Sequence, residues 1–103
     1  MTKEYIEKEA ERQLRMVYDP EIPVNIYDLG MIYEIEANKD LDLYVKMTLT
    51  SPACPVAESL PGEVKARLKT IRNVRDVYID LVWEPAWNQD MMSEEAKLIL
   101  GFF

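Results

Sequence analysis

The sequence has no histidine and a single cysteine, Cys54, among its 103 residues. Without histidine, the chain cannot build a Ser–His–Asp triad or any metal site that needs an imidazole ligand. One cysteine forms no disulfide within the chain and cannot fill a structural zinc shell. Any metal chemistry is therefore incomplete within one chain, and nothing in the cysteine content requires an oxidising compartment.

The chain also lacks the usual features of proteins that bind nucleotides, nucleic acids or membranes. Its three glycines lie far apart, so there is no glycine-rich phosphate loop. No apolar run approaches the length of about 18 residues that spans a bilayer, and the N-terminus lacks the apolar stretch of a signal peptide. The net charge of −7 opposes binding to nucleic acid or to an anionic membrane. We expect a cytoplasmic protein with neither kind of partner.

Hydrophobic periodicity predicts one domain over residues 1–103 with the order helix, strand, strand, helix, strand, helix. The predicted elements cover residues 3–17, 31–37, 41–50, 56–71, 74–83 and 94–100. Because a helix separates the second strand from the third, these two strands are expected to run parallel. The predicted fold class is a two-layer α/β (α+β) domain, in which a small mixed three-stranded sheet carries its helices packed on one face.

The second predicted strand alternates without interruption between apolar and polar residues. Its apolar residues are expected on the covered face of the sheet: Leu41, Leu43, Val45, Met47 and Leu49. Its polar residues are expected on the opposite face: Asp42, Tyr44, Lys46, Thr48 and Thr50. Thr2 and Ser93 are expected to cap the first and last helices, and Gly101 to end the last one.

The only cysteine lies where the predicted strand–helix connection contains two prolines, Pro52 and Pro55. A thiol at a helix N-terminus lies near the positive end of the peptide dipoles, which favours the thiolate. Cys54 is therefore the first candidate for chemistry in this protein. A small, buried and inert apolar side chain is the alternative interpretation, and from the residues alone the two interpretations are about equal.

Four segments of the sequence together resemble one protein family, that of the SufT and PaaD proteins, also known as domain of unknown function 59. Eukaryotic relatives belong to the cytosolic iron–sulfur targeting machinery. The resemblance covers nearly the whole chain in the right order and spacing. The segments are Asp19–Ile26, Asp28–Gly30, Thr48–Pro55, and the C-terminal pattern of Trp83, Pro85 and Trp87 followed by Met92 and Ser93.

The resemblance implies a role in iron–sulfur cluster assembly or in the maturation of metalloproteins, with assembly proteins or apo-targets as partners. The family's motif cysteine corresponds to Cys54. Its neighbours in the implied site are Asp19, Glu21 and Ile22 of the preceding loop, and Thr48, Thr50 and Ser51 of the approach to the cysteine. The residues leave open whether a loop carboxylate serves as a hard iron ligand or raises the thiol pKa by like-charge repulsion.

Three functions remain open at this point. The favoured one is a non-catalytic assembly factor that holds iron or a labile iron–sulfur cluster transiently at Cys54, shared between chains in a possible homodimer. One thiolate is too few for a stable cluster, which usually takes about four. The second is a cysteine-dependent enzyme, disfavoured because there is no histidine to activate the thiol. The third is a structural adaptor in which Cys54 is inert.

Overall fold

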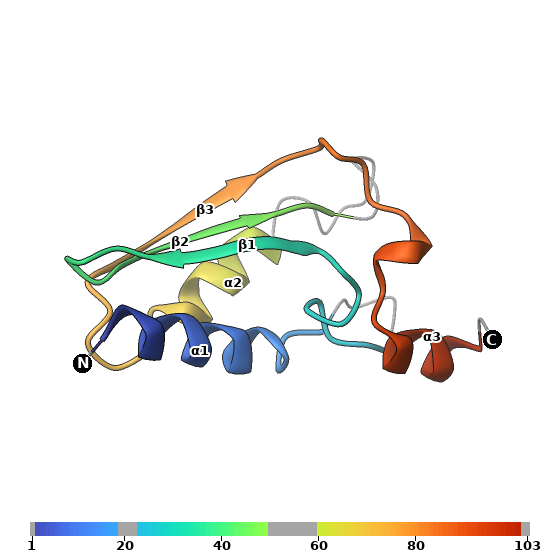
Figure 1. The fold of residues 1–103 in the computed structure, drawn as a ribbon, viewed down its shortest axis with the longest axis horizontal. Helices are drawn as coiled ribbons and strands as arrows, with labels where there is room; N and C mark the ends of the chain where they lie inside the picture. Colours follow the sequence, from blue (N-terminus) through green and yellow to red (C-terminus); the bar gives the residue numbers. More distant parts are fainter. Residues whose placement is uncertain (1, 19–22, 50–59, 102–103) are drawn as a thin grey trace.

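A computed structural model of the protein describes residues 2–18, 23–49 and 60–101. The predicted order of helices and strands is confirmed (Figure 1), and the structure adds a short 3₁₀ helix, η2, that the periodicity did not predict. The elements are α1 (Lys3–Leu14), β1 (Ile32–Ala37), β2 (Asp42–Met47), α2 (Leu60–Leu68), β3 (Asp76–Leu81), η2 (Gln89–Met91) and α3 (Glu94–Leu100).

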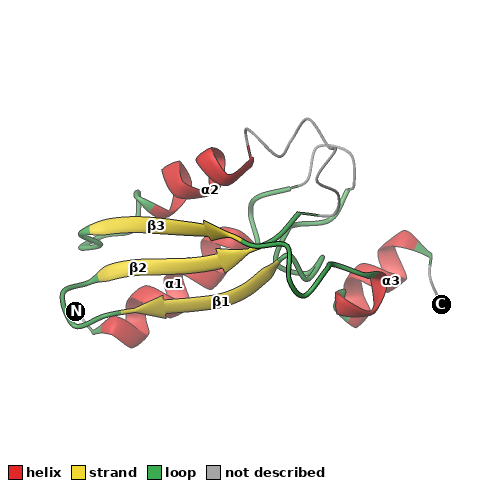
Figure 2. Ribbon diagram, turned by 90° about the horizontal axis from the view of Figure 1, so that it is seen from above, coloured by secondary structure: helices red, strands yellow, loops and turns green. Residues whose placement is uncertain are grey.

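The three strands form one mixed sheet in the order β1-β2-β3. β1 pairs antiparallel with β2, and β2 pairs parallel with β3, as the helical connection between them predicts. α1 and α2 lie on the same face of the sheet, whereas α3 lies beyond one end of the strands (Figures 1 and 2). The predicted two-layer architecture is therefore confirmed, and none of the described helices covers the second face of the sheet.

The core lies between the sheet and the two helices. Every buried position of α1 and α2 falls on the predicted apolar stripes: Ile6, Ala10 and Leu14 in α1, and Leu60, Val64 and Leu68 in α2. In β2, the alternating residues Leu43, Val45 and Met47 face them, each at most 1% exposed. Burying an aliphatic side chain of this size stabilises the fold by about 1.5–3 kcal/mol, so these stripes supply most of the driving force.

The predicted helix caps are also present. The Thr2 hydroxyl accepts a hydrogen bond from the Tyr5 amide at 3.2 Å, and the Ser93 hydroxyl accepts one from the Ala96 amide at 3.1 Å. α3 ends at Gly101 in a left-handed conformation with φ of 78°. These bonds satisfy amide groups that the first helical turn leaves unpaired, which explains where both helices begin.

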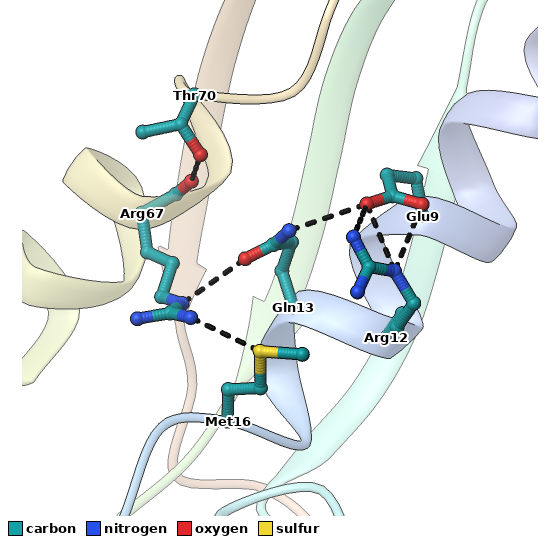
Figure 3. A network of polar contacts seen from close by, with 6 residues as sticks. All are labelled: Glu9, Arg12, Gln13, Met16, Arg67 and Thr70. Atoms are coloured by element: carbon teal, nitrogen blue, oxygen red, sulfur yellow. Dashed lines mark hydrogen bonds and ion pairs between the residues drawn. The ribbon is translucent and has the colours of Figure 1, made fainter.

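α1 and α2 are joined at their rim by a polar network (Figure 3). The Arg67 guanidinium donates to the Gln13 amide oxygen at 3.1 Å and contacts the Met16 sulfur, also at 3.1 Å. The Gln13 amide nitrogen donates to Glu9, which also pairs with Arg12. These hydrogen bonds from Arg12 lower the pKa of Glu9. The network lies largely in solvent, so its main effect is to align the two helices.

One expectation for β2 is wrong, because Asp42 was assigned to the solvated face and is only 3% exposed. The Arg75 guanidinium just before β3 holds it in place, with its Nε donating to Oδ1 at 2.8 Å. The hairpin turn adds a second anchor, since the Asn38 side-chain oxygen accepts from the Asp42 amide at 3.0 Å. A buried carboxylate keeps its charge only when it is paired, and here the pair joins the start of β2 to β3.

Replacing Arg75 with methionine is expected to lower the unfolding midpoint at pH 7 by several degrees, because it leaves the Asp42 carboxylate buried and unpaired. Hydrogen bonds from Arg75 lower the pKa of Asp42. Their stabilising effect is therefore complete above the ordinary carboxyl pKa of about 4 and is lost as the pH falls through the lower folded-state value. The difference between variant and wild type should shrink on acidification.

Thermal unfolding from pH 7 to pH 2 measures this effect. The Arg72→Met variant is the matched control, since Arg72 is an exposed arginine three residues away. Equal midpoints for Arg75→Met and the control at pH 7 would show that the ion pair contributes nothing. A difference that stays constant down to pH 2 would mean that the lost contact is one of packing rather than of charge.

Candidate functional site

Most of the candidate residues from the sequence lie outside the described part of the chain. They are Cys54, Asp19, Glu21, Ile22, Thr50 and Ser51. Their proximity to one another, and the position of Cys54 at the start of a helix, therefore stay predictions. The structure does describe the seventh candidate, Thr48, and the residues from which both candidate segments depart.

Thr48 follows the last residue of β2 and is fully buried, which contradicts its assignment to the solvated face. β2 ends at Met47, and side chains alternate between the two faces of the sheet only within a strand. The alternation therefore does not determine which way the side chain of Thr48 points. The Thr48 amide donates to the carbonyl of Met31 at 2.8 Å. This hydrogen bond holds the Thr48 backbone in place just before the segment that contains Cys54.

A chain of backbone hydrogen bonds connects this point to the other candidate segment. The Met31 amide donates to the Ile26 carbonyl at 3.2 Å, and the Ile26 amide donates to the Val17 carbonyl at 2.8 Å. Together with the bond from Thr48, these link the residues next to 19–22 with the residues next to 50–59. Both segments therefore depart from the same end of the domain.

Asp28 of the Asp28–Gly30 motif has a structural role in the loop that precedes β1. Its carboxylate accepts from the Asn25 side chain at 2.7 Å and from Arg15 at 3.4 Å, and its amide donates to the Asn25 side-chain oxygen at 2.9 Å. Asp28 is 9% exposed. These bonds fix a turn of the loop that precedes β1.

The turn at Asp28–Gly30 is docked against the C-terminal motif, which is distant in sequence. The Trp87 indole donates to the Leu29 carbonyl at 2.7 Å, and the Ser93 amide donates to the Asp28 carbonyl at 2.8 Å. Gly30, with φ of 82°, lies so close to Met91 that an added Cβ would be 2.2 Å from the Met91 carbonyl oxygen. Two of the motifs behind the family resemblance are thus packed on each other, and Trp87 is a structural residue.

An open cleft of about 570 Å³ lies beside this contact. Its lining consists of Gly30, Ile32, Tyr33, Lys46, Glu84, Pro85 and Met91. The Tyr33 hydroxyl donates to the Pro85 carbonyl at 2.6 Å, and Ile32 of the lining is the register partner of Met47, the residue before Thr48. The cleft therefore adjoins the point from which the Cys54 segment departs.

The chemistry of the cleft suits hydrogen bonding better than metal binding. Its described lining offers a phenol, an ammonium group, a carboxylate and one thioether, that of Met91, and a single soft ligand is too few to hold a soft metal ion. Burial raises the pKa of the Tyr33 phenol. Sequence reasoning missed Tyr33 and Glu84, because neither stands out from ordinary strand and loop composition.

Among residues 2–18, 23–49 and 60–101, no cluster of three or more histidine, cysteine, aspartate or glutamate side chains is arranged to hold a metal ion. In the same part of the chain, no helix combines the length and the apolar character of a membrane span.

Comparison with known proteins confirms the resemblance seen in the sequence. The family model described as iron–sulfur cluster assembly protein matches residues 7–81. A Porphyromonas gingivalis protein named Fe-S protein maturation auxiliary factor is 50% identical over 104 residues, covering 99% of this chain and 99% of its own length. The Staphylococcus aureus Fe-S protein maturation auxiliary factor SufT is 40% identical over 86 residues, covering 84% of this chain and 98% of its own length.

A solved structure supports the same assignment. The crystal structure of a Bacillus anthracis protein described as a domain of unknown function, DUF59, matches with a TM-score of 0.91 and 34% sequence identity. The match covers 98% of this chain and 96% of the other. The similarity therefore includes the first helix, the sheet and the C-terminal region rather than one motif.

Proposed function

This chain belongs to the iron–sulfur cluster assembly protein family, and we propose that it delivers iron–sulfur cargo to client proteins through the thiol of Cys54. Its general role is iron–sulfur protein assembly or maturation, as the names of its relatives state. The observation that carries the proposal is the end-to-end match at 50% identity with a maturation auxiliary factor.

The proposed site combines Cys54 with the residues that flank it in sequence and with the loop that departs from the same end of the domain. Supporting it are the three backbone hydrogen bonds that link Val17, Ile26, Met31 and Thr48. The proposed neighbours of the thiol are Asp19, Glu21, Ile22, Thr48, Thr50 and Ser51. In this arrangement the carboxylates serve as hard co-ligands for iron, and the hydroxyl groups that remain accessible donate to a thiolate or bound sulfide.

We propose a carrier rather than an enzyme, because a catalytic thiol needs a general base and the chain has no histidine. The relatives are named as auxiliary factors, which fits a role without turnover. Since a thiol that binds iron must stay reduced, we place this activity in the cytoplasm. The partners are then proteins of the assembly machinery or apo-proteins that receive the cargo.

The cargo is proposed to be labile and shared between two molecules. One chain supplies one thiolate, whereas a stable iron–sulfur site needs about four soft ligands. Two chains, each contributing Cys54, would hold the cargo weakly enough to release it. A homodimer that forms with the cargo and separates without it is the expected consequence.

Anaerobic reconstitution with iron and sulfide tests this directly. Wild type is expected to gain a charge-transfer absorption and to shift towards dimer in size measurements, while Cys54→Ser is expected to do neither. The control is Thr70→Ser, a conservative change at an exposed residue just after α2. Its loading should equal that of wild type.

Two results would contradict the shared-site proposal. One is a monomer that holds a stoichiometric cluster tightly, and the other is a Cys54→Ser protein that loads as well as wild type. A third result would narrow the function to targeting, meaning recognition of client proteins without cargo. In that case the wild-type protein never takes up iron or sulfide, but Cys54→Ser still loses binding to the client. Titration of the thiol with an alkylating reagent distinguishes the carrier from an inert structural adaptor. In the adaptor, Cys54 of the folded protein would be completely protected from alkylation.

A further inference from the structure

The face of the sheet opposite α1 and α2 carries a patch of aromatic and acidic side chains. Figure 2 looks onto this face, with α1 behind the strands. We call it the outer face. Its residues are Glu34 and Glu36 of β1, Tyr44 and Lys46 of β2, and Tyr78 and Asp80 of β3, around a hollow of about 320 Å³.

Two tyrosines form the centre of the outer face. Tyr44 and Tyr78 are register partners on adjacent strands, and their rings stack with centroids 5.0 Å apart and planes 15° from parallel. Because this separation is close to the strand spacing of about 4.8 Å, the stack runs across the strands. The second face of the Tyr44 ring is therefore turned towards β1, where its register partner is Glu36. Each tyrosine remains 45% exposed.

The charge around this stack is negative. The described residues of the outer face include three carboxylates, Glu34, Glu36 and Asp80, and one ammonium group, that of Lys46. Lys46 forms an ion pair with Glu34 at 3.6 Å and is also the register partner of Asp80, so the charge that it does not offset is that of Glu36, the register partner of Tyr44. The carboxylate of Asp76, at the start of β3, raises the pKa of Tyr78 by its negative charge, in keeping with this field.

The molecule contains an internal example of what such a surface binds. At the C-terminal end of α1, the Arg15 guanidinium lies over the Tyr27 ring at 4.5 Å from its centroid. The same guanidinium reaches the Asp28 carboxylate at 3.4 Å. A planar cation between an aromatic ring and a carboxylate is favourable, and arginine suits this geometry better than lysine.

We infer that the outer face is a docking surface for a basic segment of a partner protein, in which an arginine stacks on Tyr44 beside Glu34 and Glu36. A second copy of this chain does not fit, since it would bring carboxylates against carboxylates in a protein of net charge −7. The inference goes beyond the proposed cargo transfer and does not depend on Cys54.

Titration with a blocked tetra-arginine peptide, followed by amide NMR shifts, tests this assignment. The largest shifts are expected at Glu36, Tyr44 and Tyr78, and a tetra-lysine peptide should bind more weakly. Tyr44→Leu removes the ring and should weaken arginine binding about two- to fivefold, whereas Tyr44→Phe should retain it. Cys54→Ser should leave the titration unchanged, which separates this test from that of the carrier role.

A charge-matched pair of variants distinguishes the surface from general attraction. Glu34→Gln with Glu36→Gln removes two charges from the outer face, and Glu94→Gln with Glu95→Gln removes two from α3. Only the first pair should weaken binding by more than about twofold. Equal effects of the two pairs, equal binding of arginine and lysine peptides, or no binding would overturn the inference. A dimer of the free protein that Tyr44→Leu dissociates would also overturn it, in favour of a second copy.

Discussion

Replacing Cys54 with serine is expected to reduce the maturation of an iron–sulfur client protein by about tenfold or more while leaving the domain folded. Serine keeps the size of the side chain but cannot form the soft thiolate bond that iron and sulfide require. Because Cys54 is the only cysteine, no second thiol in the chain can substitute for it. The measurement is the activity of an apo-client that is reactivated by loaded protein under anaerobic conditions.

A second variant, Cys54→Ala, separates chemistry from packing. If Cys54 acts through its thiol, both variants lose maturation and keep the unfolding midpoint of wild type. If Cys54 is only a buried apolar residue, alanine is tolerated, whereas serine costs about 1 kcal/mol or more because its hydroxyl is buried. Full maturation activity in both variants would refute a functional role for the thiol.

The architecture follows from periodicity in the sequence because each element has one apolar side. The stripe of Ile6, Ala10 and Leu14 in α1 is buried as its helical spacing predicts. The predicted parallel pairing of β2 with β3 is also present. Both features depend on local spacing and on simple rules of connection, so the sequence is sufficient to predict them.

The errors arise where a distant residue determines the environment. Asp42 has the spacing of an outward-facing residue, but it is buried because Arg75, far along the chain, pairs with it. Thr48 has the same spacing and is buried because β2 ends before it. Neither the partner nor the end of the strand can be deduced from alternation.

The sequence likewise predicts some parts of the candidate site and misses others. The family resemblance identified Asp28–Gly30 and the C-terminal motif, but not that they pack on each other through Trp87 and Ser93. It also did not reveal the cleft at Tyr33, which adjoins the end of β2. Contacts between segments so far apart depend on the tertiary fold, and local spacing in the sequence does not reveal which distant residues meet.

The contact between the two motifs makes Gly30 the most sensitive glycine of the described chain. Gly30→Ala is expected to destabilise the protein by about 3 kcal/mol or more. The left-handed φ of 82° alone costs an alanine about 1–2 kcal/mol. The larger part of the lost stability comes from a clash with the Met91 backbone. An added Cβ would lie 2.2 Å from the Met91 carbonyl oxygen and 2.6 Å from its carbonyl carbon. The backbone must move away, which disturbs the packing of Met92, a residue only 5% exposed.

The other two glycines provide matched controls for these contributions. Gly101 also has a positive φ, of 78°, but nothing lies within 4 Å of an added Cβ, so Gly101→Ala measures the backbone cost by itself, about 1–2 kcal/mol. Gly62 lies inside α2 with open space around it, so Gly62→Ala should stabilise the helix by about 0.5–1 kcal/mol. Chemical denaturation of the three variants gives these free energies. If Gly30→Ala costs no more than Gly101→Ala, the close approach to Met91 contributes nothing to stability, and the packing between the two motifs would not explain why Gly30 is glycine.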